Sequence, residues 1–370
     1  MKVLHLLASG GYGGIESLMR SYSKKSQLDN IFVFVWGTGD IYNDMYNQGI
    51  ECINLNEKNG RFIHTVMAII KKCNEIKPNV IITHHDVAQF KAVLIYLRIF
   101  KPNIKTIAYA HENAVDIVQN GNKIKSFLTK KINAIGFHCA DGVVAISKSV
   151  QKSIEDIFKI PNKKIKVIYN GTDTKKIPHR IRKTVTNNTK LLYVGRLIEK
   201  KGVQTTINAL AMLPMSLNWT FDIVGDGPYR ATLEKQVKKV GLIKKIHFYG
   251  ECNNIPEILN EHDIFIHMPS WEEGFGITVI EAMSAGMICI CLKKGGIPEI
   301  IEHGIDGILV DSKEELVRIL EKIMFSTFNK DIYQISNVAI KKAQKFSIEK
   351  FSNELDSYIR IVYKNNMIDI

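Results

Sequence analysis

Residues 273–283 read Glu-Gly-Phe-Gly-Ile-Thr-Val-Ile-Glu-Ala-Met, a glycine-rich turn that runs into a helix, with one glutamate before the helix and one within it. Gly274 and Gly276 leave backbone N–H groups open at the helix start, where an anionic phosphate is favoured. Glu273 and Glu281 supply two carboxylates that can each accept hydroxyl groups of a sugar. A helix that needed only a capping acid would not require Gly-Phe-Gly. We therefore interpret this segment as a ligand-binding site.

The sequence on both sides of this segment repeats one pattern, a short apolar run followed by an amphipathic stretch. After residue 184 the runs predicted as strands are 190–194, 219–224, 246–249, 263–267 and 287–291. Before it they are 3–7, 31–36, 80–83, 106–110, 142–146 and 165–169. Strands that alternate with helices are typical of parallel α/β architecture. We expect two doubly wound domains, with ligands bound at the carboxyl ends of the strands.

The length of 370 residues suits two domains. A polar segment at 172–190, rich in Lys, Arg, Thr and Asn, predicts the crossing between them. We therefore expect an N-terminal domain over 1–170 and a C-terminal domain over 171–349. The last amphipathic segment has no strand after it, so a helix over about 350–370 is expected to pack back on the N-terminal domain.

Two cations follow the strand predicted at 190–194. Arg196 and Lys201 both lie between this strand and the next predicted helix. A guanidinium gives a forked contact and an ammonium a point charge, so the pair suits a diphosphate. A solvated charge cluster is the alternative interpretation.

A second glycine cluster, which includes Gly13 and Gly14, follows the first predicted strand. Glycines let the backbone turn tightly and approach a ligand. The cluster departs from the G-x-G-x-x-G fingerprint of dinucleotide-binding proteins, because Glu16 occupies the third glycine position. A tight strand-to-helix turn without a ligand remains the alternative.

His111 stands at the end of the strand predicted at 106–110. A polar residue at the carboxyl end of a strand faces the ligand-binding edge in this architecture. It could hydrogen-bond a substrate hydroxyl. A surface histidine without such a role is the alternative.

The net charge of +13 is concentrated in one half of the chain. Residues 1–183 hold 28 Lys and Arg against 14 Asp and Glu, whereas residues 184–370 hold 22 against 23. A basic half indicates an anionic partner, such as a nucleic acid, a membrane surface or a phosphorylated substrate. A general bias toward lysine in the composition is the alternative explanation of this excess of positive charge.

The six cysteines are scattered, and only Cys289 and Cys291 lie close together. Further ligands at metal-binding spacing do not follow them, so we expect buried, reduced thiols and no metal site. A targeting segment is not visible, and no apolar run approaches the ~20 residues that span a bilayer. The sequence therefore predicts a cytoplasmic protein.

Together these features resemble glycosyltransferase family 4, the retaining glycosyltransferases of the GT-B fold (glycosyl transferases group 1). The resemblance covers nearly the whole chain. Besides the segments above, it includes Val144–Ser147, Ile168–Asp173 and Val224–Pro228. It implies a GT-B fold, two Rossmann-like domains that face a central cleft, and transfer of a sugar from a nucleotide-sugar donor with retention of configuration (EC 2.4).

The resemblance also implies roles for individual residues. Glu273 and His111 would be catalytic and contact the transferred sugar, and Glu281 would bind the ribose. Groups expected to hold or approach the donor diphosphate are Arg196, Lys201, Gly13, Gly14, Gly274, Phe275 and Gly276. The C-terminal domain would bind the nucleotide and the N-terminal domain the acceptor.

Apart from this co-substrate, no cofactor is expected. An Asp-x-Asp pair is missing from the sequence, in line with metal-independent catalysis. A uridine diphosphate sugar is favoured over a guanosine diphosphate sugar as donor.

Lysines alternate with apolar residues over 123–135, a pattern suited to an anionic membrane surface. An ordinary surface helix is the alternative. We hypothesise a saccharide acceptor, lipid-linked as in cell-surface polysaccharide assembly, and a peripheral position at the inner face of the membrane.

Two other functions remain open. The basic half favours a nucleic-acid-binding protein, but a recognisable module and interleaved aromatic residues are missing, so no nucleic-acid partner is expected. The same fold also serves other GT-B enzymes, such as an epimerase, and an inactive nucleotide-sugar binder would retain the motifs.

Overall fold

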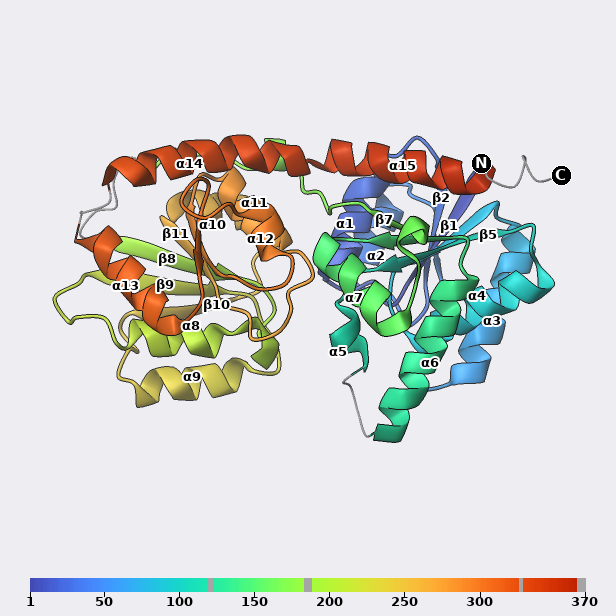
Figure 1. Ribbon diagram of the computed structural model, residues 1–370, viewed down its shortest axis with the longest axis horizontal. Helices are drawn as coiled ribbons and strands as arrows, with labels where there is room; N and C mark the ends of the chain where they lie inside the picture. The colour runs from blue at the N-terminus through green and yellow to red at the C-terminus, as the bar shows by residue number, and fades with distance from the viewer. Residues whose placement is uncertain (119–122, 183–187, 326–328, 365–370) are drawn as a thin grey trace. The chain divides into compact units, whose positions relative to one another are not determined.

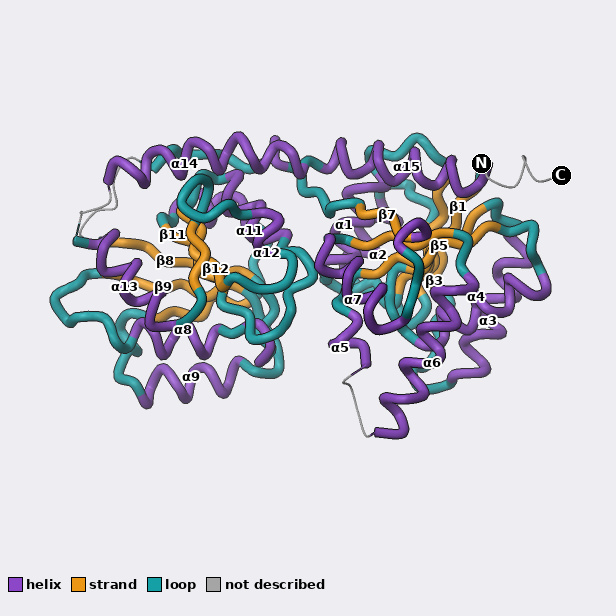
Figure 2. Tube along the Cα trace, viewed as in Figure 1, coloured by secondary structure: helices purple, strands orange, loops and turns teal. Residues whose placement is uncertain are grey.

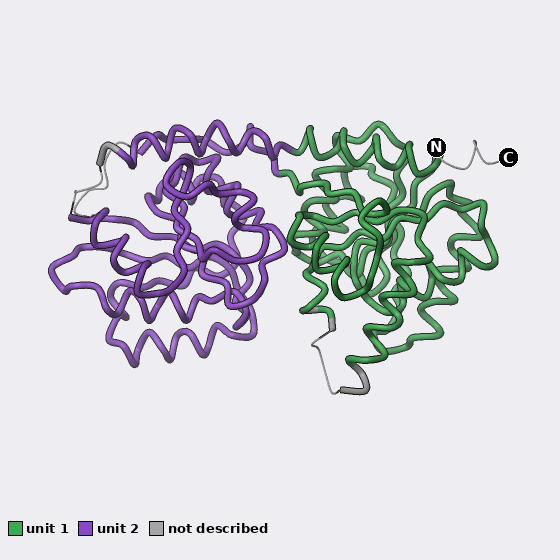
Figure 3. Tube along the Cα trace, in the orientation of Figure 1, with its two compact units in different colours: residues 1–171, 348–370 green, residues 172–347 purple. Residues whose placement is uncertain are grey.

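The computed structural model describes residues 1–118, 123–182, 188–325 and 329–364. The chain divides into two compact units (Figure 3). Unit 1 comprises residues 1–171 with 348–370, and unit 2 comprises residues 172–347.

Unit 1 is built on a parallel sheet with helices on its faces (Figures 1 and 2). Its strand order is β3-β2-β1-β4-β5-β6-β7. The strands are β1 (Lys2–Leu7), β2 (Asp29–Phe34), β3 (Cys52–Asn54), β4 (Val80–Thr83), β5 (Lys105–Ala110), β6 (Gly142–Ala145) and β7 (Ile165–Val167). The helices are α1 (Gly14–Ser23), α2 (Asp40–Asn47), α3 (Phe62–Ile76), α4 (Ala88–Phe100), α5 (Ala114–Val118), α6 (Lys123–Cys139), α7 (Lys148–Phe158) and α15 (Ile348–Lys364).

Unit 2 repeats this architecture with the strand order β10-β9-β8-β11-β12-β13, again with parallel pairing. The strands are β8 (Thr189–Val194), β9 (Trp219–Val224), β10 (Ile246–Gly250), β11 (Ile264–His267), β12 (Ile288–Leu292) and β13 (Ile308–Val310). The helices are α8 (Val203–Leu210), α9 (Arg230–Lys239), α10 (Ile255–Glu261), α11 (Ile277–Ser284), α12 (Ile297–Ile300), α13 (Lys313–Met324) and α14 (Asn329–Ala343).

The central strands are buried on both faces because helices cover both sides of each sheet. In β4 all four residues are buried, and in β11 likewise. Strands that are buried along their whole length and mostly apolar are typical of parallel sheets. The predicted two-domain α/β fold is therefore confirmed.

Each sheet has one place where the strand order reverses. In unit 1 it lies between β1 and β4, and in unit 2 between β8 and β11. Ligands of doubly wound sheets bind outside the carboxyl ends of the strands at such a point. The segments that follow these four strands are thus the places to examine for a site.

Helix α15 packs in unit 1, beside α1. The phenolic hydroxyl of Tyr22 donates to the Asp356 carboxylate at 2.6 Å, and the backbone N–H of Gln27 donates to the same carboxylate at 2.9 Å. The C-terminal helix is therefore tied to α1 and to the turn before β2. Residues 365–370 of the predicted helix lie outside the described residues.

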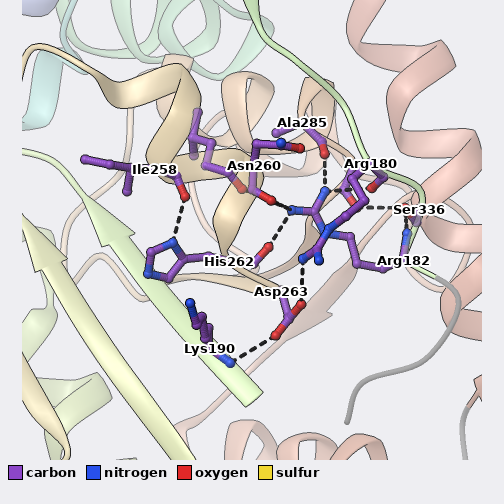
Figure 4. Close-up of polar contacts among 11 residues, drawn as sticks. Arg180, Arg182, Lys190, Ile258, Asn260, His262, Asp263, Ala285 and Ser336 are labelled. Atoms are coloured by element: carbon purple, nitrogen blue, oxygen red, sulfur yellow. Dashed lines mark hydrogen bonds and ion pairs between the residues drawn. The ribbon is translucent and has the colours of Figure 1, made fainter. Parts of the chain in front are cut away.

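The middle of the predicted crossing is fixed in unit 2 by a buried arginine (Figure 4). The guanidinium of Arg182 donates to the backbone carbonyls of Leu259, Asn260, His262 and Ala285. These carbonyls lie at the C-terminal ends of α10 and α11, where a cation is favoured. Residues 183–187 of the crossing are not described. Among the described residues, no helix is long and apolar enough to cross a bilayer.

Candidate active site

Residues 273–276 of the glycine-rich segment lie in the loop between β11 and α11, and residues 277–283 lie in α11 itself. Glu273 is buried, and its Oε2 atom accepts from Nζ of Lys201 at 2.8 Å. The same oxygen lies 3.2 Å from Nε2 of His267, the last residue of β11. Lys201 comes from the loop after β8, so the two strands at the switch point of unit 2 bring these groups together.

The electrostatics of Glu273 follow from this arrangement. Burial opposes ionisation and by itself raises the pKa of the carboxyl group. The ammonium of Lys201 and the hydrogen bond from His267 outweigh it, so the pKa of Glu273 lies well below its ordinary value. Glu273 is therefore a fixed anion at neutral pH that accepts hydrogen bonds, and it cannot serve as a proton donor there.

Glycines hold this loop in place. Gly276, the N-cap of α11, has a φ of 109°. Gly295 has a φ of 57°, and a Cβ atom there would lie 2.2 Å from the carbonyl oxygen of Glu273. The N–H of Gly296 donates to that same oxygen at 2.7 Å. Gly295 and Gly296 therefore fix the backbone at Glu273. They were not predicted as site residues, although a glycine pair shortly after a buried strand, with only Lys293 and Lys294 between, was a signal for them.

Gly202 brings Lys201 close to the same loop. Its φ is 74°, and a Cβ atom on it would overlap the carbonyl oxygen of Met268 at 1.6 Å. Nζ of Lys201 also lies 5.3 Å from the centre of the Trp271 ring. His267 and Trp271 were not predicted as site residues, since a histidine inside an apolar run and a tryptophan after it look like core positions.

Glu281 lies in α11, in a different environment. Its Oε1 atom accepts from the Thr172 hydroxyl at 3.0 Å. Burial raises the pKa of Glu281 to about 7, and the hydrogen bond from Thr172 opposes that shift. The two glutamates of the motif thus differ in charge behaviour, because only Glu273 has a cation beside it.

Phe275 and Arg196, two other predicted site residues of unit 2, differ in their exposure to solvent. Phe275 is buried and its ring lies 5.7 Å from the ring of Phe346, edge to face. Arg196 is exposed, and within the described residues its guanidinium has no ion-pair or hydrogen-bond partner. Lys201, by contrast, is engaged with Glu273. Arg196 is thus the more available of the two cations for an anionic ligand.

Unit 1 carries the predicted glycine positions at the start of α1. Gly13 is the N-cap, and a Cβ atom on it would lie 2.2 Å from Oε2 of Glu16. Gly14 begins the helix, with open space where a Cβ would be. Oε1 of Glu16 lies 3.3 Å from Nε2 of His85, whose Nδ1 accepts from the N–H of Ala8. His85 therefore joins the loops that follow β1 and β4.

His111 follows β5 and is buried, contrary to the surface alternative. Its ring stacks on Tyr109, with centroids 4.3 Å apart. Burial lowers the pKa of His111 well below its ordinary value, and the nearby His85 and Lys91 act in the same direction. His111 is therefore a neutral ring at physiological pH.

Cys289 and Cys291 are buried thiols in β12. Burial raises the pKa of both above the ordinary value, so they remain protonated. In the part of the chain that the structure describes, no group of three or more His, Cys, Asp or Glu side chains could hold a metal ion.

Two family models match this chain. Residues 13–176 match the family Glycosyltransferase Family 4, and residues 174–346 match Glycosyl transferases group 1. N-acetyl-alpha-D-glucosaminyl L-malate synthase of Bacillus anthracis is 27% identical over 66% of this chain and 65% of its own length. An uncharacterized 41.2 kDa protein in the cps region of Klebsiella pneumoniae is 26% identical over 99% of this chain and 100% of its length.

A solved structure has the same fold. Anabaena HepE in complex with UDP and glucose superposes with a TM-score of 0.82 at 22% identity, over 97% of this chain and 99% of that chain. The chain belongs to the group 1, family 4 glycosyltransferases of the GT-B fold, an enzyme class that transfers sugars (EC 2.4). It spans 56 to 65% of the length of three curated relatives that it matches.

Proposed function

We propose that this protein is a retaining glycosyltransferase that moves a sugar from a uridine diphosphate sugar to a saccharide acceptor in cell-surface polysaccharide biosynthesis. The observation that carries the proposal is the 2.8 Å contact between Lys201 and Glu273 beside the glycine-rich start of α11. A fixed carboxylate can hold sugar hydroxyls, while the cation and the open N–H groups of the helix start can stabilise a departing diphosphate.

Within this proposal, unit 2 binds the donor. Arg196 and Lys201 hold the diphosphate together with the backbone of Gly274, Phe275 and Gly276. Glu273 contacts the transferred sugar, and Glu281 binds the ribose. Unit 1 binds the acceptor and supplies Gly13, Gly14 and His111 to the reaction. HepE was solved with UDP-glucose, which supports a uridine nucleotide. No metal is required by this set of groups.

The first test is a screen of nucleotide-sugars for protection against thermal unfolding, because a ligand of the native state raises its Tm. Uridine diphosphate sugars are expected to raise the Tm, with and without a chelator of divalent cations. Protection by guanosine diphosphate sugars alone would overturn the donor assignment. Proton NMR of the product's anomeric centre then distinguishes retention from inversion, and release of an epimerised sugar without transfer would indicate an epimerase.

We also propose that the acceptor is lipid-linked and that the protein works in the cytoplasm at the inner face of the membrane. Helix α6 supports this, since Phe127, Leu128 and Ile135 are about half exposed. Lys130 and Lys131 are exposed beside them. The side chains of Lys123 and Lys125, also part of the predicted basic pattern, lie outside the described residues. An exposed face that is both apolar and basic suits anionic lipid.

Sedimentation with vesicles tests the membrane proposal. Wild-type protein is expected to bind vesicles rich in anionic lipid at low salt and not to bind vesicles of neutral lipid. The double substitution Phe127→Ser and Leu128→Ser should weaken binding. Met215→Ser, at an apolar residue of unit 2 that is 91% exposed, is the control and should leave it unchanged. Equal binding by all three proteins, or none by the wild type, would contradict the proposal.

A further inference from the structure

Unit 1 contains a buried chain of hydrogen bonds that leads from α15 to β4. The hydroxyl of Ser26 donates to Oδ1 of Asp356 at 2.8 Å, and Nδ2 of Asn30 donates to Ser26 Oγ at 2.8 Å. Oδ1 of Asn30 lies 2.9 Å from Nε2 of His5. Nδ1 of His5 lies 2.9 Å from Nε2 of His84, so the chain ends at a histidine directly after β4.

The direction of the hydrogen bonds from Asn30 to His84 is fixed by one backbone carbonyl. Nδ2 of Asn30 also donates to the backbone oxygen of Leu28, which can only accept. Oδ1 of Asn30 must therefore face His5 as an acceptor. Because burial lowers the pKa of both His5 and His84, the two rings are neutral at pH 7, so Nε2 of His5 carries the ring's one proton and Nδ1 of His5 is a lone pair. His84 must donate from Nε2 to that lone pair, which leaves Nδ1 of His84 without a proton.

The chain thus delivers an unused acceptor to the carboxyl edge of the sheet. Nδ1 of His84 is buried and has no hydrogen-bond partner among the described residues. Two rings neighbour His84, those of Tyr109 and His111, with centroids 5.3 and 5.7 Å away, and both the Tyr109 hydroxyl and Nε2 of His111 are buried and unpartnered among the described residues. Buried polar atoms are rarely left unpaired, since each costs about 1–3 kcal/mol. Nδ1 of His84 needs a donor, and either the Tyr109 hydroxyl or Nε2 of His111 can be one; only the donation from His111 requires its proton on Nε2.

The rings of His84 and His111 lie nearly close enough to form a hydrogen bond. The centroids of His84 and His111 are 5.7 Å apart, whereas those of the hydrogen-bonded pair His5 and His84 are 5.2 Å apart. An approach of about half an ångström would equal the bonded pair. Hydrogen bonds at active sites are often long in the free enzyme and tighten with substrate.

We propose that His84 positions His111 by accepting a hydrogen bond at Nδ1 from Nε2–H of His111, which leaves Nδ1 of His111 as an acceptor for a substrate hydroxyl. The contact between His111 and a substrate hydroxyl rests on the proposed function. His5, His84 and His111 then share one tautomer and form a head-to-tail chain. Burial lowers the pKa of His5 to about 4 and that of His84 well below its ordinary value, so neutral rings fit this chain.

Nitrogen NMR of the full chain labelled at histidine tests the proposal without any substrate. Long-range proton–nitrogen spectra at neutral pH are expected to show all three rings neutral, with the proton on Nε2. A ring of His111 protonated on Nδ1, or a charged His84, would overturn it. Resonances are assigned from variants that lack one histidine each.

The substitution His84→Phe removes the acceptor while keeping an aromatic ring. His111 is then expected to lose its single tautomer, whereas His5, still held by Asn30, keeps the proton on Nε2. His64→Gln, at an exposed histidine of α3, is the control and should change none of the three. Should His84→Phe not fold, Asn30→Leu breaks the chain at its other end and is expected to release the tautomers of His5 and His84.

Kinetics of sugar transfer separately test whether His84 and His111 act in the reaction. His84→Phe is expected to lower kcat about 10- to 100-fold, as loss of an orienting partner does elsewhere, without reducing thermal protection by the donor. An unchanged kcat together with the expected tautomers would refute the role of His84 in the reaction. Absence of transfer in the wild type would refute the proposed function instead, and the spectra would still decide the tautomers.

Discussion

The Nζ atom of Lys201 lies 2.8 Å from Oε2 of Glu273, and the two residues are 72 positions apart in the chain. Each comes from the segment that follows one of the two strands at the switch point of unit 2. The pair is partly buried, so the interaction is less screened than at the surface. It makes Glu273 a permanent anion and leaves the exposed Arg196 as the readily available cation.

Glu273→Gln is expected to reduce kcat for sugar transfer about 100-fold, because the amide cannot supply the charge next to the reacting sugar. Steady-state assays with a protective uridine diphosphate sugar measure this. Glu272→Gln is the matched control, since its side chain accepts from the N–H of Gly295 and the amide oxygen can still do so. Equal losses in both variants would argue against a special role for Glu273.

Glu281→Gln is expected to stabilise the free protein at high pH. Burial raises the pKa of Glu281 to about 7, from an ordinary value of 4.5. Stability from the neutral carboxyl is therefore fully present below about pH 4.5 and is lost as the pH rises through 7. The glutamine carries no charge at any pH. The Tm of Glu281→Gln relative to that of the wild type should therefore rise between pH 4.5 and pH 7 and then level off.

Thermal unfolding of both proteins from pH 4.5 to 8 checks this. A Tm difference that does not vary with pH would contradict the buried, neutral carboxyl. Protection of Glu281→Gln by the donor should be weaker than that of the wild type, because the amide accepts fewer hydrogen bonds from ribose.

Gly295→Ala is expected to destabilise unit 2 by about 1 kcal/mol or more, through its positive φ and the overlap with Glu273. Gly304→Ala separates the two causes. Gly304 has a φ of 78°, but nothing lies where its Cβ would be. Urea unfolding should therefore show the smaller loss for Gly304→Ala. Transfer should fall in Gly295→Ala alone, and equal effects on both measurements would refute the overlap.

Arg182→Gln is expected to lower the free energy of unfolding by about 3 kcal/mol, since it leaves buried carbonyl oxygens of α10 and α11 without donors. Arg180→Gln is the control two residues away. Arg180 pairs with Asp263 at 3.0 Å but is half exposed, so its loss should stay within about 1 kcal/mol. Denaturant unfolding measures both, and a small effect of Arg182→Gln would show that water replaces its hydrogen bonds.

The alternation of apolar runs and amphipathic stretches was enough to predict two doubly wound sheets, because periods of 2 and 3.6 residues are local properties. The predicted strands recur in the structure within one or two residues at most ends. Strands β3 and β13 were missed. Each has only three residues and lies at an edge of its sheet, so its apolar signal is short.

The sequence by itself determined the architecture and the glycine-rich segment at 273–283, since turn residues and helix starts depend on near neighbours. Only the tertiary structure decided which charges meet. Strand order, which no local pattern encodes, places Lys201 on Glu273, His84 beside His5, and Gly295 against the backbone of Glu273. Burial of those pairs then sets their charge, because desolvation depends on everything packed around a group and not on its place in the chain.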